Sequence, residues 1–487
     1  MTHLKLIIIN HNYKYELENI CRLFFPFERV EVFTEPQPCD GMIAVTEVAS
    51  DSLRVSLTAG GFDKCMSDAL KPDTSGDEVE RRLAVMLYKL LCDCTGMHHK
   101  WGILTGVRPG KLMRRLQTDL GDAAAEEWFS KALMVSDEKI ALCRRAAENE
   151  ERIIAMSGER DFSLYISVPF CPSRCSYCSF VSHSVERSFS LLQDYVSLLL
   201  KEIEQTGDIA RRLGLRLHTV YFGGGTPTVL SAEQLTAVMA AVRRCFDMSH
   251  CAEWTVEAGR PDTITRDKLM AIKAGGATRI SINPQTMNDA VLETIGRRHT
   301  AQQTVDAFAL ARECGFDNIN MDLIAGLPGD SIESYRDTVA KIMSLGPESV
   351  TVHALSMKRA SAMTTGGDLP EAERGRLADS MITYGSSVFE QNGYEPYYLY
   401  RQSKTVGNLE NTGFCKPGTE CLYNIYIMDE THSILACGGS AVTKLRAPDG
   451  YIERIFNFKY PYEYVNRFDE IIARKSGIES FYAEHFK

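Results

Sequence analysis

Three cysteines near the middle of the chain lie close enough in sequence to bind one metal centre. Cys171, Cys175 and Cys178 have the spacing C-x3-C-x2-C and follow an apolar run at residues 164–168 that is typical of a buried strand. Three thiolates on one tight loop can bind three irons of a [4Fe–4S] cluster and leave the fourth iron open. The alternatives are a zinc site and three unrelated thiols. A structural zinc site needs a fourth ligand, for which the nearest candidate is His183.

Strands and helices alternate after residue 160, and they must position this loop. The expected strands cover residues 164–168, 218–222, 253–257, 279–283, 318–324 and 349–354. Helical patterns lie between them at residues 191–213, 232–246, 269–274, 304–314 and 334–345. Six βα units in a row predict a parallel sheet, open or closed. Ligands of such folds gather at the carboxyl ends of the strands.

Candidate binding residues occur near the ends of almost all of these strands. The second strand ends in a glycine run at residues 223–227, where bare backbone can approach an amino-acid ligand closely, although such a run alone often marks only a turn. Glu257, Gln285 and Ala354 follow or end other strands, and Asp322 lies inside the fifth. The carboxylates of Glu257 and Asp322 could each bind ribose hydroxyls or an ammonium group. Alternatively, each could only accept hydrogen bonds within the protein at the end of its own strand. Together with the cysteine loop they predict one shared pocket.

The composition is that of a soluble globular protein with two or three domains. Of 487 residues, 44% are apolar and 24% charged, and the formal net charge of −10 gives no global basic field for nucleic acid. No apolar stretch is long enough to span a membrane, and the N-terminal run is unlike a signal peptide. The 15 cysteines show no regular framework, so we expect reduced thiols and a cytoplasmic location.

Residues 1–155 predict a separate α+β domain without a nameable chemistry. Four short strands are expected at residues 4–9, 30–33, 42–48 and 53–57, and a helix from Asp77 to about Gly96. Arg108 and Lys111 stand at the start of another expected helix, where they could bind an anion or remain solvated charges.

The cysteine loop, with Tyr177 directly before its last cysteine, resembles the signature of the radical S-adenosylmethionine (SAM) superfamily. Further motifs resemble its oxygen-independent coproporphyrinogen III oxidase family, namely LYISVPFCPSRCSYC, YFGGGTPT, TVEAGRPD, RISINPQTMN, IGRRH and NMDLIAGLPG. The whole chain, including WGILTGVRPGK and YRQSKTVGNLENTGF, is similar to the HemZ-type coproporphyrinogen dehydrogenases. The resemblance implies an α/β fold with a partial (β/α)6 radical SAM barrel at residues 160–392. It also implies an N-terminal α+β domain at 1–155 and a C-terminal α+β cap at 393–487.

The resemblance also implies roles for single residues. In the superfamily, the open iron of a [4Fe–4S] cluster binds SAM, and an electron from the cluster cleaves SAM to a 5′-deoxyadenosyl radical. Cys171, Cys175 and Cys178 would ligate the cluster. The SAM bound to it would be lined by Tyr165, which is also the implied catalytic residue, and by Gly224, Glu257 and Ala354. The positions that match a second SAM site are Tyr177, Gly225, Thr226, Gln285, Arg297 and Asp322.

The implied reaction belongs to anaerobic haem biosynthesis. Two propionate side chains of coproporphyrinogen III would become vinyl groups, which gives protoporphyrinogen IX. The radical would take a hydrogen from the propionate β-carbon, carbon dioxide would leave, and one electron would pass to an acceptor. The implied partners are this tetrapyrrole and a single-electron donor such as flavodoxin or ferredoxin, with no nucleic acid and no membrane span.

Two positions depart from the decarboxylating members of that family. Phe180 stands where they carry a further cysteine, and Ser167 stands where they have a histidine. The loop pattern CxYCxF and the GRxH segment are shared with a haem-binding chaperone branch of the superfamily. The favoured hypothesis is therefore the decarboxylase, and the alternative is a haem carrier that keeps the cluster and SAM site. Radical SAM methylation of another substrate is a third hypothesis.

The region after residue 393 is expected to cap the barrel and select the substrate. Strands are predicted at residues 423–428 and 433–436. A tetrapyrrole with four carboxylates needs a flat apolar wall and several cations, which the tyrosines at 394–400 and Arg401, Lys404 and Lys444 could provide. The alternative is a half-buried antiparallel sheet with solvated basic residues.

Overall fold

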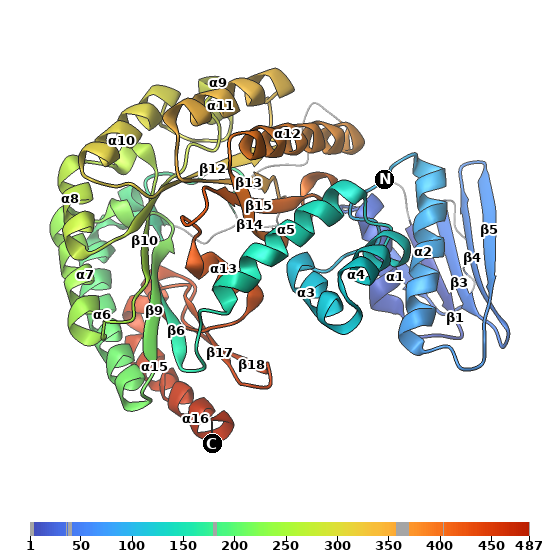
Figure 1. The fold of residues 1–487 in the computed structure, drawn as a ribbon, viewed down its shortest axis with the longest axis horizontal. Helices are drawn as coiled ribbons and strands as arrows, with labels where there is room; N and C mark the ends of the chain where they lie inside the picture. The colour runs from blue at the N-terminus through green and yellow to red at the C-terminus, as the bar shows by residue number, and fades with distance from the viewer. Residues whose placement is uncertain are drawn as a thin grey trace. The chain divides into compact units, whose positions relative to one another are not determined.

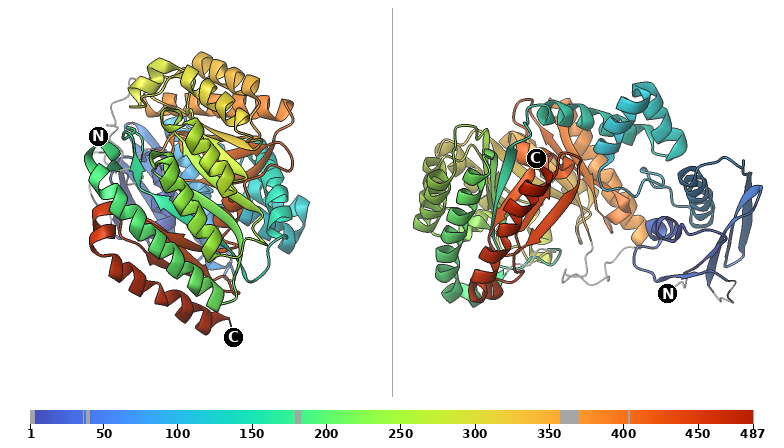
Figure 2. Two further views of the ribbon diagram at one scale, coloured as in Figure 1. Left: turned by 90° about the vertical axis from the view of Figure 1, so that its left-hand side faces the viewer. Right: turned by 90° about the horizontal axis from the view of Figure 1, so that it is seen from below.

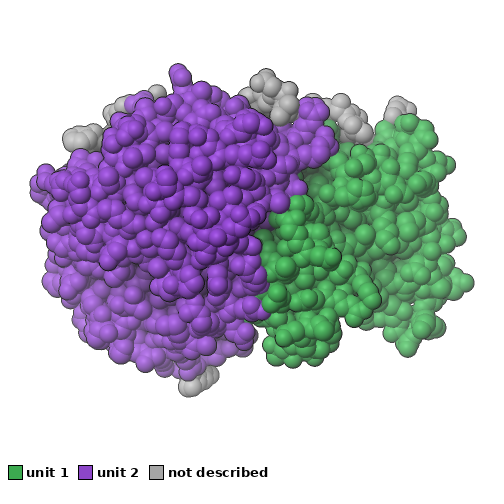
Figure 3. All heavy atoms as spheres, turned by 45° about the horizontal axis from the view of Figure 1, so that its top comes forward, with its two compact units in different colours: residues 1–144, 401–409 green, residues 145–400, 410–487 purple. Residues whose placement is uncertain are grey.

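The computed structural model describes residues 4–35, 37, 41–178, 183–356, 370–402 and 404–486. These residues form two compact units, coloured separately in Figure 3. Unit 1 comprises residues 1–144 and 401–409, and unit 2 comprises residues 145–400 and 410–487. Phe180, at which the sequence departs from the decarboxylating family members, lies outside the described residues. None of the helices in the described ranges combines the length and the apolar content that crossing a bilayer requires.

Unit 1 is built on a five-stranded sheet in the order β2-β1-β3-β4-β5. Its strands are β1 (Leu4–Ile9), β2 (Val30–Phe33), β3 (Met42–Val48), β4 (Ser52–Ala59) and β5 (Phe62–Ala69). Its helices are α1 (Lys14–Phe24), α2 (Gly76–Thr95), α3 (Pro109–Leu120), α4 (Asp122–Glu127) and the first part of α5 (Asp137–Ile154). The four predicted strands and the helix that ends before Gly96 are confirmed. We did not predict β5, because its side chains are largely exposed and polar, nor α1.

The centre of unit 2 is a run of six parallel strands, as the sequence predicts. They are β6 (Asp161–Val168), β9 (Arg216–Gly224), β10 (Glu253–Gly259), β11 (Arg279–Ile282), β12 (Ile319–Ala325) and β13 (Ser349–Ala354). Helices cover the outer side of this curved sheet, as Figures 1 and 2 show: α6 (Val185–Arg212), α7 (Ala232–Cys245), α8 (Arg266–Gly275), α10 (Ala301–Glu313) and α11 (Ile332–Leu345). Four of these helices begin at a residue whose hydroxyl accepts a backbone N–H of the first turn, namely Ser231, Thr265, Thr300 and Ser331.

Alternate residues of the six strands lie in different environments, as the two-residue period of a strand requires. One set is aliphatic and buried, for example Leu164 and Ile166 on β6. The other set is polar and forms hydrogen bonds from strand to strand. Thr219 donates to Ser163 at 2.7 Å, and Arg279 donates to Ser349 at 2.5 Å. One face of the sheet is therefore lined with polar groups, which is a suitable wall for a polar ligand.

The chain after residue 393 adds strands to both edges of this sheet. β14 (Glu395–Arg401) and β15 (Glu410–Cys415) extend it beyond β13, after helix α12 (Glu371–Gln391). β16 (Ser433–Cys437), β17 (Val442–Arg446) and β18 (Ile452–Phe456) extend it beyond β6, and β16 runs parallel to β6. The last helices are α14 (Pro461–Asn466), α15 (Phe468–Arg474) and α16 (Ser476–His485). The strand expected at residues 433–436 is confirmed as β16.

The strand predicted at residues 423–428 is wrong, because this segment is helix α13 (Leu422–Asp429). Its β-branched and aromatic residues favour a strand by local propensity. The side chain of Glu253 overrides that propensity, because its carboxylate accepts the backbone N–H groups of Leu422 at 2.8 Å and Tyr423 at 3.2 Å. A carboxylate at this position satisfies the first N–H groups of a helix and opposes the positive end of its dipole.

Two of the cations that we assigned to a substrate already have partners in the protein. The guanidinium of Arg401 donates to the backbone carbonyls of Leu104 and Asn408 and lies 5.3 Å from the centre of the Trp101 ring, all within unit 1. The ammonium of Lys444 lies 3.3 Å from the carboxylate of Glu430. The expectation that these two groups present their charge to a tetrapyrrole is therefore corrected.

Candidate functional site

The three cysteines occupy one loop at the carboxyl end of β6. Cys171 belongs to the short strand β7 (Phe170–Cys171), and the amide of Cys178 donates to the carbonyl of Cys175 at 3.2 Å in a tight turn. Ser176 anchors the loop to the segment after β11, because its amide donates to the carbonyl of Ile295 at 3.0 Å. This segment carries the IGRRH motif, so two separate motifs of the sequence meet here.

The fit of an iron–sulfur cluster to this loop follows from its donor groups. Across the described ranges, no three His, Cys, Asp or Glu side chains converge in a geometry that could hold a metal ion. The loop nevertheless supplies three thiols, the donor type that iron–sulfur clusters take. Hydrogen-bond donors already lie beside two of them: Thr226 Oγ1 is 3.4 Å from Cys171 Sγ, and Arg260 Nη1 is 3.8 Å from Cys175 Sγ. Donors of this kind stabilise thiolate charge.

The glycine run at the end of β9 lies directly against the end of β6. The amide of Gly225 donates to the carbonyl of Val168 at 2.8 Å. A Cβ atom on Gly225 would lie 2.5 Å from the carbonyl oxygen of Phe170, and Gly224 has a φ of +110°, which L side chains rarely adopt. Only glycine therefore fits both positions, and the backbone beside the cysteine loop is free of side chains.

Glu257 lies at the end of β10, next to a cluster of three tyrosines. The hydroxyl of Tyr221 donates to its Oε1 at 2.5 Å, and burial raises the pKa of the Glu257 carboxyl to about 7. The Tyr221 ring stacks on Tyr423 with centroids 4.5 Å apart, and Tyr165 lies 6.2 Å from each of them. Burial also raises the pKa of Tyr165. The predicted residues Tyr165 and Glu257 thus lie in one aromatic cluster.

Asp322 has the opposite electrostatic environment. Burial alone would raise the pKa of its carboxyl, but polar neighbours outweigh burial and hold that pKa below its ordinary value. His353 Nε2 lies 3.8 Å from Asp322 Oδ2, and Asn320 donates to Oδ1 at 2.7 Å. Asp322 is therefore an ionised carboxylate on the polar face of the sheet.

Gln285 carries a buried acceptor without a partner. Its backbone bridges to β12, because its amide donates to the carbonyl of Asp322 at 2.9 Å, and its φ of 70° is unusual for a residue with a side chain. Its Oε1 has no hydrogen-bond partner within the described structure. Buried acceptors are nearly always satisfied in folded proteins, so this oxygen is suited to a donor from a ligand.

Two further predicted residues contact each other. Arg297 donates from Nη2 to the hydroxyl of Tyr177 at 2.9 Å and from Nη1 to the carbonyl of Asn283 at 3.0 Å. Ala354 ends β13 and is buried, and its amide donates to Asn411 at 3.1 Å. The structure thus brings Tyr177 and Arg297 together, whereas Asn411, the partner of Ala354, was not predicted.

Sequence reasoning missed four side chains of this region: Tyr221, Arg260, His353 and Tyr423. The strand period could have found Tyr221, which stands two residues before Gly223 and so on the same face of β9. His353 stands directly before the predicted residue Ala354, and Arg260 lies inside the quoted motif TVEAGRPD. Tyr423 carries no such signal, because its segment reads as a strand.

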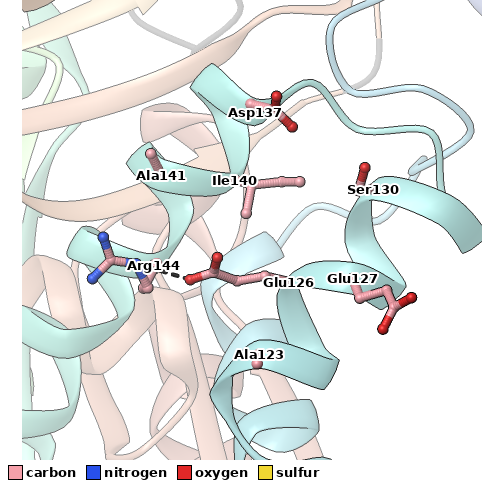
Figure 4. Close-up of a pocket in the computed structure, with 8 residues that line it drawn as sticks. All are labelled: Ala123, Glu126, Glu127, Ser130, Asp137, Ile140, Ala141 and Arg144. Carbon is pink, nitrogen blue, oxygen red and sulfur yellow. Dashed lines mark ion pairs between the residues drawn. The ribbon is translucent and has the colours of Figure 1, made fainter.

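A separate hollow of about 400 Å³ lies in unit 1, between α4 and α5 (Figure 4). Glu126 and Arg144 form an ion pair at 3.1 Å, and Ile140 lines the hollow on the α5 side. None of the predicted site residues lines this hollow, so it gives no support to the proposed chemistry.

Comparison with known proteins places the chain in a family. Residues 165–342 match the model of the radical SAM superfamily. The chain is 35% identical over 472 residues to the oxygen-independent coproporphyrinogen-III oxidase-like protein HemZ of Bacillus subtilis, which is 94% of each chain. It belongs to the radical SAM family of oxygen-independent coproporphyrinogen-III oxidase-like proteins. The cofactors of this family, a [4Fe–4S] cluster and SAM, are therefore its cofactors.

Two further similarities cover the central part of the chain. The heme chaperone HemW of Haemophilus influenzae is 29% identical over 309 residues, which is 62% of this chain and 75% of the relative. The solved structure of coproporphyrinogen III oxidase (HemN) from Escherichia coli matches with a TM-score of 0.50 and 22% identity, over 66% of this chain and 72% of that one. The HemN match supports the expected fold.

Proposed function

We propose that this protein catalyses the radical SAM oxidative decarboxylation of coproporphyrinogen III to protoporphyrinogen IX. The observation that carries the proposal is the similarity to HemZ, a coproporphyrinogen-III oxidase-like protein, over 94% of both chains. This similarity includes unit 1 and the C-terminal strands, whereas the similarity to the heme chaperone covers 62% of the chain. We infer a reaction on a tetrapyrrole, supported by a single-electron donor such as flavodoxin or ferredoxin.

In this proposal the cysteine loop holds the cluster and the strand ends hold SAM. Cys171, Cys175 and Cys178 ligate the cluster, and their loop is held by Ile295. When bound, the cluster and SAM supply a carbon radical that can remove a hydrogen atom from a substrate. Gly224 and Gly225 carry no side chains, so the amino-acid part of SAM can approach the backbone next to the loop closely.

The two buried carboxyl groups take different parts in that binding. Glu257, with a pKa of about 7, is partly protonated near neutral pH and can both donate to and accept from a ribose hydroxyl. Asp322 stays ionised and can accept hydrogen bonds or face a positively charged group. The free Oε1 of Gln285 offers one more acceptor next to Asp322. Tyr165, Tyr221 and Tyr423 form an apolar wall that excludes water from this side.

A second candidate function is a haem chaperone, and one observation favours it. Ser167 occupies the position where the decarboxylating members have a histidine. Its hydroxyl donates to the carbonyl of Gly439 at 2.8 Å, and the residue is only 2% exposed, so it cannot reach a substrate. The similarity to HemW points in the same direction.

One assay separates the two functions. The cluster is reconstituted without oxygen, and the protein receives SAM, a reductant, an electron acceptor and coproporphyrinogen III. The decarboxylase forms vinyl products, which are followed by protoporphyrin fluorescence after oxidation. Stoichiometric haem binding without any vinyl product contradicts the decarboxylase and supports the chaperone.

A further inference from the structure

A buried arginine from β10 reaches the cysteine loop. Arg260 follows Gly259 at the end of that strand and is 3% exposed. Its Nη1 donates to Ser173 Oγ at 3.0 Å and lies 3.8 Å from Cys175 Sγ, within the range of an N–H···S hydrogen bond. The guanidinium of Arg260 therefore joins the end of β10 to the loop that carries Cys175.

The other edge of the same guanidinium is held by a carboxylate. Nε and Nη2 of Arg260 donate to the two oxygens of Asp262 at 2.9 Å each. Burial opposes ionisation of Asp262, but these two bonds from Arg260 outweigh it and keep the pKa of the carboxyl below its ordinary value. This bidentate pair fixes the plane of the guanidinium, and it leaves Nη1 directed at the loop.

The positive charge of the Arg260 guanidinium affects the reduction potential of a cluster bound by Cys175. A [4Fe–4S] cluster gains one negative charge when it accepts an electron, and nearby charges and hydrogen bonds to its sulfurs set its reduction potential. A cation in a buried place acts with little screening by solvent. A positive charge beside Cys175 therefore favours the reduced cluster, and the negative charge of Asp262 partly offsets that effect.

We propose that Arg260 is a positioning residue that holds the cysteine loop through Ser173 and raises the reduction potential of the cluster through Cys175. The negative charge of Asp262 partly offsets that rise. The proposal deepens the proposed function, since it rests on the three cysteines as cluster ligands. It adds the reason why a buried arginine beside that loop is paired with an aspartate two residues further along the chain.

The two charged residues make predictions of opposite sign. In Arg260→Gln the loss of the cation should make reduction of the cluster about tenfold less favourable, which is about 59 mV toward negative potential for one electron. In Asp262→Asn the loss of the anion should shift the potential in the positive direction. A purely structural role would damage the loop in both variants and would not give opposite shifts. Arg260→Lys keeps a cation and should stay closer to the unchanged protein than Arg260→Gln.

The experiment is a redox titration of the reconstituted full chain, with the reduced cluster followed by electron paramagnetic resonance. Opposite shifts in Arg260→Gln and Asp262→Asn support the proposal. Equal potentials in all variants, or a shift of both in one direction, overturn it. If Arg260→Gln fails to hold a cluster, Asp262→Asn decides alone: an unchanged or more negative potential overturns the proposal.

The titration needs neither SAM nor a tetrapyrrole, so its result is independent of whether the protein decarboxylates. Failure of the cysteine assignment would appear differently, as a cluster that survives in Cys175→Ala. Failure of the decarboxylase proposal would appear only in the product assay.

Discussion

At the scale of the residue, two carboxyl groups on the polar face of the unit 2 sheet differ in how they hold a proton. Glu257 is surrounded by aromatic rings, and burial raises its pKa to about 7. Asp322 is equally buried, but His353 and Asn320 hold its pKa below the ordinary value. Near neutral pH this face of the sheet therefore carries one partly protonated carboxyl, Glu257, and one full negative charge, Asp322. The two side chains suit different groups of a nucleoside ligand.

The raised pKa of Glu257 predicts a dependence of stability on pH. Glu257 binds its proton more tightly when folded, so its contribution is complete below the ordinary pKa of 4.5 and is lost as the pH rises through about 7. The difference between these two values corresponds to roughly 3 kcal/mol. In Glu257→Gln this part of the pH dependence should vanish, as measured by urea unfolding of the cluster-free protein at about pH 5 and pH 8.

The comparison must be made between the two proteins, because buried histidines act in the opposite sense. Burial lowers the pKa of His432 to about 3 and that of His299 to about 4, so these groups add stability as the pH rises. If the Gln variant loses as much free energy of unfolding between the two pH values as the unchanged protein, Glu257 does not carry the raised pKa.

The cysteine loop makes a second prediction at this scale. Cys175→Ala should abolish the brown absorbance of the reconstituted cluster, because two thiolates cannot hold the three irons that the loop is proposed to bind. Cys65→Ala is the matched control, since Cys65 is an exposed thiol of unit 1. Full absorbance in Cys175→Ala, or equal loss in both variants, would show that the cluster is bound elsewhere.

At the scale of the element, the close contact between the ends of β6 and β9 predicts the effect of a single methyl group. In Gly225→Ala the new Cβ would lie 2.5 Å from a backbone carbonyl of Phe170, so the two strand ends must separate. We expect little cluster to be retained and SAM binding to weaken at least tenfold, as measured by absorbance and calorimetry.

A matched glycine exists for this test. In Gly106→Ala the nearest atom to the new Cβ is a side-chain carbon of Leu104 at 3.7 Å, an ordinary contact. This variant should load the cluster and bind SAM like the unchanged protein. Normal SAM affinity in Gly225→Ala would mean that the glycine run serves the fold alone.

The same contacts explain which elements the sequence could predict. The six parallel strands were predictable because each is a short apolar run followed by turn residues, and the residues at their ends share one edge of the sheet. Helix α13 was not predictable, because a carboxylate from β10 starts it, and Glu253 is far away in the sequence. Arg260 was not singled out for a related reason: its place beside Cys175 depends on how β10 and the loop meet.

At the scale of the whole molecule, a buried ion pair ties the last helices of unit 2 to its core. Lys475 precedes α16, and its ammonium lies 2.9 Å from the carboxylate of Glu202 on α6, with both side chains no more than 2% exposed. Glu202 also accepts the amide of Gly438 at 2.7 Å and the hydroxyl of Tyr464 at 2.6 Å. The pair therefore holds the turn after β16 as well as the C-terminal helices.

Lys475→Met should destabilise the protein by about 3–5 kcal/mol, because it leaves a buried carboxylate without its cation. Arg212→Met is the control on the same pair of helices. It removes an exposed ion pair between Arg212 and Glu479, which is 2.8 Å long, and should cost much less stability than Lys475→Met because solvent screens an exposed pair. Both are measured by urea unfolding, and similar losses in the two variants would show that burial adds nothing to the Lys475 pair.

The parallel pairing of β16 with β6 has a consequence for the order of events during synthesis. β6 leads into the cysteine loop, and it pairs with β9 on one edge and on the other with β16, which the ribosome makes long after β6. Until β16 has been made, the edge of β6 that pairs with it has no strand partner. Iron and sulfide are therefore expected to enter only after β16 has been made and has paired with β6.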